Sequence, residues 1–191
     1  MSELFSIQLQ NRQQQGRDGV WLDLPTTTEQ VQAALRQIGI SSDNPQGLFI
    51  SGYFAEEEKR FAIPYNMVLA SNVDELNFLA SRLETLSAEE RAELNAALQA
   101  PQSELFSIGR ITDFPENVDY YVHLPDVHGP AQLGDYYLNR SGMVDMPEEW
   151  KGGIDTAQFG RYVAQQEQGA FTQYGYLVKS GDEWQKVHEG Q

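Results

Sequence analysis

Two consecutive helix signals stand in the middle of the chain, and segments with the patterns of strands lie on both sides of them. Asn72 with Glu75, and Ser87 with Glu90, have the spacing of capping boxes, which start helices. Each pair is followed by apolar residues at helical spacing, and Pro101 ends the second run. The chain is therefore expected to combine helices with sheets, with residues 56–100 mostly helical.

The N-terminal segment predicts a small sheet with one helix packed on it. Strand patterns occur at residues 4–9, 20–24 and 47–54. Thr26 with Glu29 forms a capping-box pattern, and Gly39 is well placed to end the helix that follows. The polar stretch from Gln10 to Gly19 suits a hairpin-type connection between the first two strands.

The C-terminal segment mixes both element types. Strand character occurs at residues 118–124 and 171–178, and a helical pattern at 130–140. Asp155 with Gln158 caps a further helix that ends near Gly169. Its residues predicted to face inward are Phe159, Tyr162 and Val163, and the final strand places Tyr174, Tyr176 and Val178 on one side.

These patterns predict an α+β protein of three small lobes. Residues 1–55 form a lobe of sheet plus helix, and residues 56–101 form a helical lobe. Residues 102–191 form a mixed lobe that carries most of the acidic surface.

The charge of the chain is strongly unbalanced. It has 28 acidic and 13 basic residues, a net charge of −15 and a pI near 4.4. Such a protein is repelled by DNA, RNA and anionic membranes, so direct binding to them is not expected. The acids concentrate between Glu56 and Asp155, which favours a partner with a basic surface.

Residue types and patterns that are absent from the sequence exclude several classes of protein. The absence of cysteine excludes disulfides, thiolate zinc sites, iron–sulfur ligation and a cysteine nucleophile. The first ten residues lack the pattern of a signal peptide, and no stretch approaches the length of a membrane span. We therefore expect a soluble, cytoplasmic protein.

Motifs for catalysis are also scarce. We find no glycine-rich phosphate loop, dinucleotide fingerprint or nucleophile elbow. His123, Asp126 and His128 are the one candidate metal site, since two imidazoles and a carboxylate can hold a divalent ion. Their spacing equally fits an exposed loop without a metal, which is our expectation. His188 lies in a charged tail and is expected to be solvated.

The aromatic residues have two interpretations. The doublets Tyr120–Tyr121 and Tyr136–Tyr137, and the three tryptophans, are either contact points for a protein partner or parts of the core. The tryptophans are Trp21, Trp150 and Trp184. Helical spacing places Tyr137 and Phe159 in the core.

The hexapeptide SELFSI occurs twice, at residues 2–7 and 103–108. A duplicated unit would place two related strands at the start of two lobes. The flanks differ, however, because QLQNRQ follows one copy and GRITDF the other. We therefore interpret the match as a coincidence rather than an internal repeat.

The order of several motifs resembles that of the ArdA antirestriction family. They are VWLDLPTTTE at 20–29, NVDELNFLA at 72–80, LGDYY at 133–137, IDTAQFGR at 154–161 and GAFTQYGY at 169–176. The resemblance implies an elongated, acidic dimer of three lobes that mimics bent B-form DNA. Such a protein occupies the DNA-binding groove of a type I restriction–modification enzyme, in its methyltransferase core, without catalysis and without a cofactor.

A mimic of this kind must lay carboxylates along a surface in place of phosphates. Charge density and position select eleven of them as candidates for the contact: Glu84, Glu93, Asp113, Glu116, Asp119, Asp126, Asp135, Asp145, Glu148, Glu149 and Asp155. The first alternative is an acidic binding module with a different basic partner. A remote alternative is a small metal-dependent hydrolase that uses the histidine cluster.

Overall fold

The computed structural model of the chain describes residues 3–14, 18–41, 45–101 and 103–188. It combines helices with antiparallel sheets, and the predicted α+β class is confirmed. The part of the hairpin connection predicted at 15–17 lies outside these residues.

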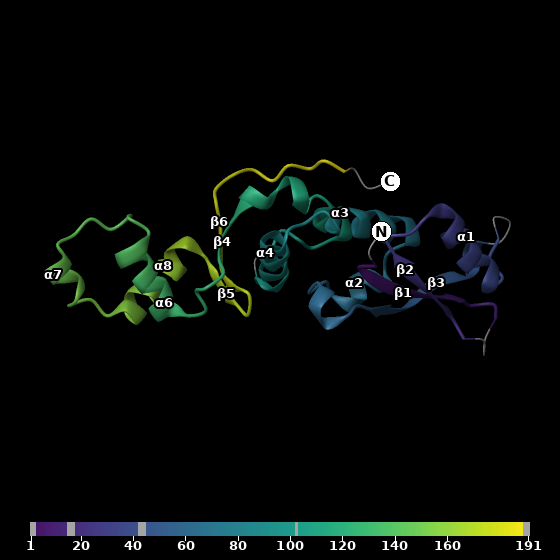
Figure 1. The fold of residues 1–191 in the computed structure, drawn as a ribbon, viewed down its shortest axis with the longest axis horizontal. Coiled ribbons are helices and arrows are strands. Elements are labelled where there is room, and N and C mark those ends of the chain that lie inside the picture. Colours follow the sequence, from purple (N-terminus) through teal and green to yellow (C-terminus); the bar gives the residue numbers. More distant parts are fainter. Residues whose placement is uncertain (1–2, 15–17, 42–44, 102, 189–191) are drawn as a thin grey trace. The chain divides into compact units, whose positions relative to one another are not determined.

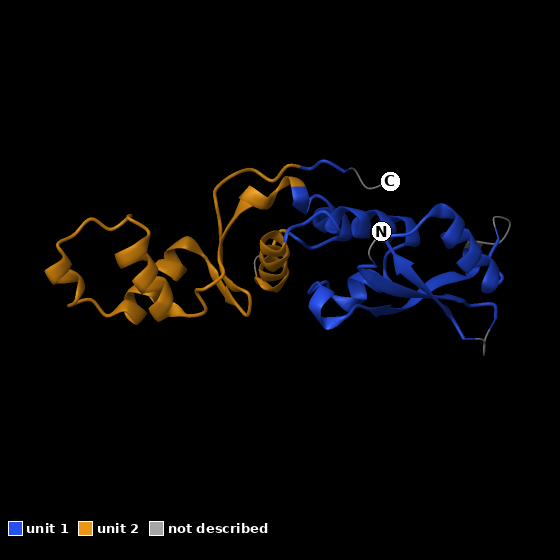
Figure 2. Ribbon diagram, in the orientation of Figure 1, with its two compact units in different colours: residues 1–87, 105–115, 186–191 blue, residues 88–104, 116–185 orange. Residues whose placement is uncertain are grey.

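The backbone contacts divide the chain into two compact units (Figure 2). Unit 1 comprises residues 1–87, 105–115 and 186–191, and unit 2 comprises residues 88–104 and 116–185. The division into three lobes stays a prediction.

The sheet of unit 1 has three antiparallel strands (Figure 1). The central strand β1 (Phe5–Asn11) pairs with β2 (Val20–Leu24) on one side and β3 (Leu48–Phe54) on the other. Alternation in β1 buries Ile7 and Leu9 completely, so one face of this sheet forms the core of the unit.

Four helices pack in unit 1. Helix α1 (Thr28–Gln37) packs on β2, α2 (Tyr65–Leu69) packs on β3, and α3 (Val73–Leu83) packs on β2 and on α5 (Ile108–Thr112). The predicted cap of α3 is confirmed, because the side chain of Asn72 accepts a hydrogen bond from the backbone N–H of Glu75 at 2.9 Å.

The capping box of α1 lies one residue later than predicted. Thr27, rather than Thr26, is the N-cap, and its partner is Gln30 rather than Glu29. A glutamine at the third helical position supplies the same side-chain acceptor as a glutamate, so both registers satisfy the sequence pattern. Gly39 follows the helix with a φ of 71°, as expected of a residue that ends a helix.

Unit 2 combines a second sheet with helices. Its strands are β4 (Tyr121–Leu124), β6 (Gly175–Lys179) and β5 (Ala170–Thr172), in that spatial order, and α4 (Ala88–Gln99) packs on β4 and β6. Helix α6 (Pro130–Asp135) continues into a π-helical turn (Tyr136–Arg140). A long connection leads from this turn to α8 (Thr156–Glu167), and it contains the short helix α7 (Glu148–Lys151).

Two predicted strands are wrong in detail. Residues 171–178 are not one strand but the hairpin of β5 and β6, turned at Tyr174. Gly175 permits this turn with a φ of 114°, and a side chain there would overlap the carbonyl oxygen of Leu124. The strand predicted at 118–124 begins only at Tyr121, because a 3₁₀ turn occupies Val118–Tyr120.

Helices α6 and α8 cross very closely. A methyl group on Gly160 of α8 would overlap the carbonyl oxygen of Pro130, and one on Gly134 of α6 would overlap that of Thr156. This contact turns Gly160 and Ala164 inward. The prediction that Tyr162 faces inward is therefore wrong, and its ring is 60% exposed.

The core of unit 2 forms around these helices and the hairpin. One cluster of buried residues in this core consists of Val127, Leu133, Ala164 and Tyr176, and the half-buried Tyr137 packs against it. No helix in the described part of the chain is both long and apolar enough to cross a membrane.

We expect Gly160→Ala to destabilise unit 2, because the added methyl group forces the backbones of α6 and α8 apart. The free energy of unfolding should fall by roughly 2 kcal/mol or more, as measured by urea denaturation. Gly152→Ala is the matched control, since a side chain there meets no atom within 4 Å and the residue has a φ of −64°. Equal effects of the two substitutions would contradict the importance of this helix contact.

Candidate partner-binding surface

Most of the charge of the protein lies in unit 2. The unit has fifteen acidic and five basic residues, a net charge of −10, whereas unit 1 has thirteen and eight, a net charge of −5. Nine of these fifteen acids lie between Glu116 and Glu167, where the chain makes turns and starts short helices, and three more lie in α4.

Seven of the eleven predicted contact carboxylates are exposed, all of them in unit 2: Glu116, Asp119, Asp126, Asp145, Glu148, Glu149 and Asp155. Local structure explains several of these positions. Glu148 and Glu149 form the first turn of α7, where carboxylates complement the helix dipole. Asp155 caps α8 by accepting a hydrogen bond from the backbone N–H of Gln158 at 2.9 Å.

Two further candidates are half-buried. Asp135, at the end of α6, accepts a hydrogen bond from the Asn139 amide at 2.8 Å and lies 3.5 Å from Nε of Arg140. Glu84 follows α3 in unit 1. The charge of Asp135 is thus partly balanced by its own neighbours.

Asp113 does not lie on the surface, and its selection as a contact residue is wrong. Its side chain is 1% exposed, and Oδ1 accepts hydrogen bonds from the backbone N–H and from Nδ1 of His188, both at 2.9 Å. His188 is therefore not a solvated tail residue, and its ring also packs edge-on against Phe78 at 4.9 Å. A partner that approaches unit 1 meets the tail and not this carboxylate.

Glu93 is half-buried on α4, and one of its carboxyl oxygens, Oε1, has no hydrogen-bond partner among the described residues. Burial, together with the nearby charges of Asp119 and Glu90, raises the pKa of Glu93 to about 8. At neutral pH its carboxyl group is mostly protonated. Glu93 therefore contributes little negative charge to the surface.

The histidine cluster is not assembled as a metal site. Nε2 of His123 donates a hydrogen bond to the carbonyl oxygen of Tyr174 at 2.7 Å, while His128 and Asp126 are exposed in the following turn. Among the residues that the structure describes, no group of three or more histidine or carboxylate side chains is placed to hold a metal ion. The sequence spacing left this open because a loop does not fix the direction of its side chains.

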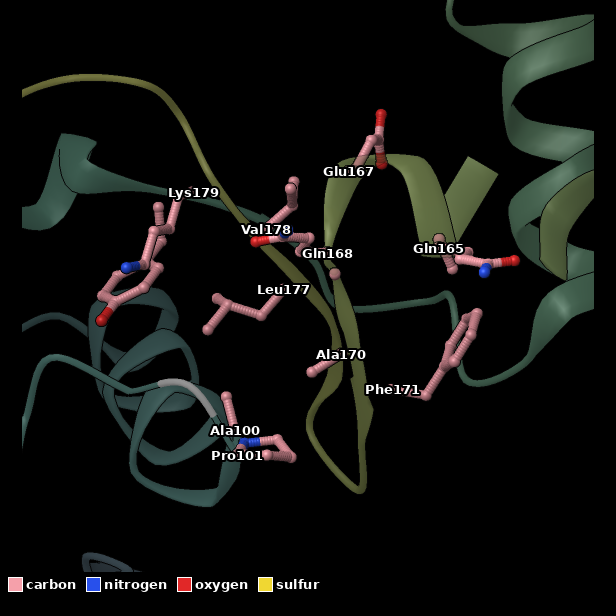
Figure 3. Close-up of a pocket in the computed structure, with 13 residues that line it drawn as sticks. Ala100, Pro101, Gln165, Glu167, Gln168, Ala170, Phe171, Leu177, Val178 and Lys179 are labelled. Carbon is pink, nitrogen blue, oxygen red and sulfur yellow. The ribbon is translucent and has the colours of Figure 1, made fainter. Parts of the chain in front are cut away.

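A hollow of about 600 Å³ lies in unit 2 between the end of α4, the hairpin and the end of α8 (Figure 3). Its charged lining residues are already bonded: Nζ of Lys179 donates to Glu104 at 2.7 Å, and Glu167 accepts hydrogen bonds from the hydroxyls of Tyr137 and Tyr176. Burial and Glu167 raise the pKa of both tyrosines. The hydrogen bonds from Tyr137 and Tyr176 to Glu167 hold the fold together at this hollow, and they do not pair a nucleophile with a base.

The spacing of Tyr137, Glu167 and Tyr176 in the sequence does not predict that their side chains meet. Tyr137 precedes Glu167 by thirty residues, and Tyr176 follows it by nine. They come together only because the π-helical turn after α6, helix α8 and the hairpin pack around one core.

Comparison with known protein families decides the identity of this fold. The model of one family, described as antirestriction protein (ArdA), matches residues 15–178. The chain belongs to the ArdA antirestriction family. No curated protein matches it.

Membership in the ArdA family implies an antirestriction function, exerted on type I restriction–modification enzymes. Proteins of this family are inhibitors rather than known enzymes. The matched range contains all the exposed carboxylates named above, whereas the tail that carries His188 follows it.

The structure of this ArdA protein separates its aromatic residues into core and surface. Tyr120 and Tyr121 are buried, and Trp184 packs edge-on against Tyr120 at 5.1 Å. Trp21 and Trp150 lie on the surface, with 49% and 68% of their area exposed. Sequence patterns alone left these assignments open, because a doublet or a lone tryptophan has no periodicity.

We expect Glu93→Gln to change how stability depends on pH. The unfolded chain releases this proton near pH 4.5 and the folded chain near pH 8, so only the folded state holds it between these values. The wild type should therefore lose stability relative to the variant as the pH rises through this window. Urea unfolding midpoints at pH 4 and pH 9 measure the difference.

Glu89→Gln, at an exposed position of the same helix, is the matched control for this prediction. If the unfolding midpoints of the wild type and Glu93→Gln changed equally with pH, the assignment of a raised pKa to Glu93 would be contradicted.

Proposed function

We propose that this protein inhibits a type I restriction–modification enzyme by occupying the DNA-binding groove of its methyltransferase core. The carboxylates of unit 2 take the places of DNA phosphates. The observation that carries this proposal is the net charge of −10 in unit 2, where seven of the candidate carboxylates are exposed.

The physical reason is the match between carboxylate and phosphate as hydrogen-bond acceptors. Duplex DNA carries about one negative charge per 1.7 Å of its axis, and a protein that binds it lines its groove with lysine and arginine. Arginine forms bidentate, charge-assisted pairs with either anion. A folded chain that holds carboxylates at the surface therefore competes with DNA for the same cations.

The structure narrows the set of carboxylates that we propose for this contact. Seven of the candidate carboxylates are exposed in unit 2, and Asp135 and Glu84 are half-exposed. Asp113 is excluded because His188 uses its oxygen, and Glu93 because it is mostly protonated at neutral pH.

Inhibition of this kind needs neither catalysis nor a cofactor, because binding alone excludes the DNA. We propose that the protein acts in the cytoplasm, where the enzyme meets incoming DNA. We also propose that it acts as a homodimer, because an isologous pair presents its acidic surface twice, related by a two-fold axis.

A competition titration tests the proposed function. A methyltransferase core is bound to a fluorescent duplex, and the protein is added at several salt concentrations. We expect displacement at micromolar concentration or below that weakens steeply as salt rises, because the contacts are ionic. Absence of displacement even at low salt would overturn mimicry and favour an acidic module with another basic partner.

Neutralising three exposed acids of unit 2 tests where the contact lies. The variant Asp145→Asn/Glu148→Gln/Glu149→Gln should displace the duplex less well and with a smaller dependence on salt, because three ionic contacts are lost. Its matched control neutralises Glu56, Glu57 and Glu58, which are exposed in unit 1 and change the net charge equally. In each triplet one acid pairs with a lysine, Glu148 with Lys151 and Glu56 with Lys59.

Equal losses in the two triple variants would show that net charge matters rather than the acids of unit 2. That result would contradict the proposed location of the contact.

A further inference from the structure

Helix α7 of unit 2 carries a tryptophan, Trp150, at the surface. Trp150 is 68% exposed. Its backbone N–H donates to the carbonyl oxygen of Pro147, and its own carbonyl oxygen accepts from Gly153, both at 3.0 Å. Nζ of Lys151 donates to Glu148 at 2.6 Å, and the lysine side chain is only 15% exposed. Local bonds therefore fix the helix while the indole ring remains outside.

The protein itself does not cover this ring. None of the described residues makes a ring-stacking or cation contact with Trp150, whereas Trp184 packs against Tyr120. Tryptophan is enriched among the residues that dominate protein interfaces.

The charges around Trp150 indicate the kind of partner that covers it. Residues 141–155 contain four acids and one base, Lys151, which is paired with Glu148. This net charge of −3 opposes contact with nucleic acid or with the same surface of a second copy. It favours a basic protein surface.

A groove that binds DNA contacts bases as well as phosphates, and carboxylates replace only the phosphates. We infer that Trp150 supplies the base-like part of the contact. Its ring enters the groove where a nucleobase would lie, and Glu148 and Glu149 of the same helix take the role of phosphates. The indole has the planar apolar face on which aromatic or guanidinium groups of a DNA-binding protein stack. This inference rests on the proposed function and adds a contact that does not depend on charge.

Substitution of Trp150 separates this contact from the ionic ones. The competition titration is repeated with Trp150→Ala and Trp150→Phe at several salt concentrations. We expect Trp150→Ala to weaken displacement at least about tenfold at every salt concentration, with the salt dependence of the wild type. Trp150→Phe should retain part of the affinity, because a smaller ring still stacks.

Trp21→Ala is the matched control, since Trp21 is an exposed tryptophan of unit 1 and should be dispensable. Circular dichroism and sedimentation of each free variant accompany the titration. Wild-type affinity of a folded Trp150→Ala variant would overturn the inference and leave the proposed function intact. A change of oligomeric state in Trp150→Ala would assign the ring to self-association and overturn it too. Failure of the wild type to displace the duplex would overturn both.

Discussion

The close crossing of α6 and α8 is the contact on which the acidic surface of unit 2 depends. Glycines at positions 134 and 160 let the two backbones meet. The chain leaves α6 through the π-helical turn, passes through α7 and returns to the contact as α8. Both ends of the segment 141–155 are therefore fixed by one packing contact. The four carboxylates of this segment repel one another, and the fixed ends together with the local bonds of α7 oppose that repulsion.

The surroundings of each carboxylate decide whether it is available to a partner. Asp113 is bonded to His188, Glu167 to two tyrosines and Glu104 to Lys179, so these acids stabilise the fold. Glu93 is instead neutralised by its own burial. The exposed acids Glu89, Glu148 and Glu149 lie at helix starts, where the backbone gains from their charge and the carboxylate stays in solvent. A formal count of acids thus overstates the charge that a partner meets.

Much of the fold follows from local patterns in the sequence. The apolar stripe of α3, its Asn72 cap and the strands of the first sheet lie where periodicity and capping chemistry predict them. Two of the failures share one cause, which is that contacts between distant residues decided the outcome. The α6–α8 contact turned Tyr162 outward, and the tail buried Asp113 from seventy-five residues away. No local pattern contains either contact.

The repeated hexapeptide shows most clearly how the effect of local sequence differs from the effect of tertiary packing. Phe5, in the first copy, lies in β1 and is 2% exposed, whereas Phe106, in the second, lies in an irregular segment before α5 and is 66% exposed. The sequence by itself determined the α+β class, the acidic character and the helices with strong caps, because these depend on composition and on neighbours along the chain. Only the tertiary structure decided which aromatic rings and which carboxylates face solvent, because burial depends on what packs against a residue from elsewhere in the chain.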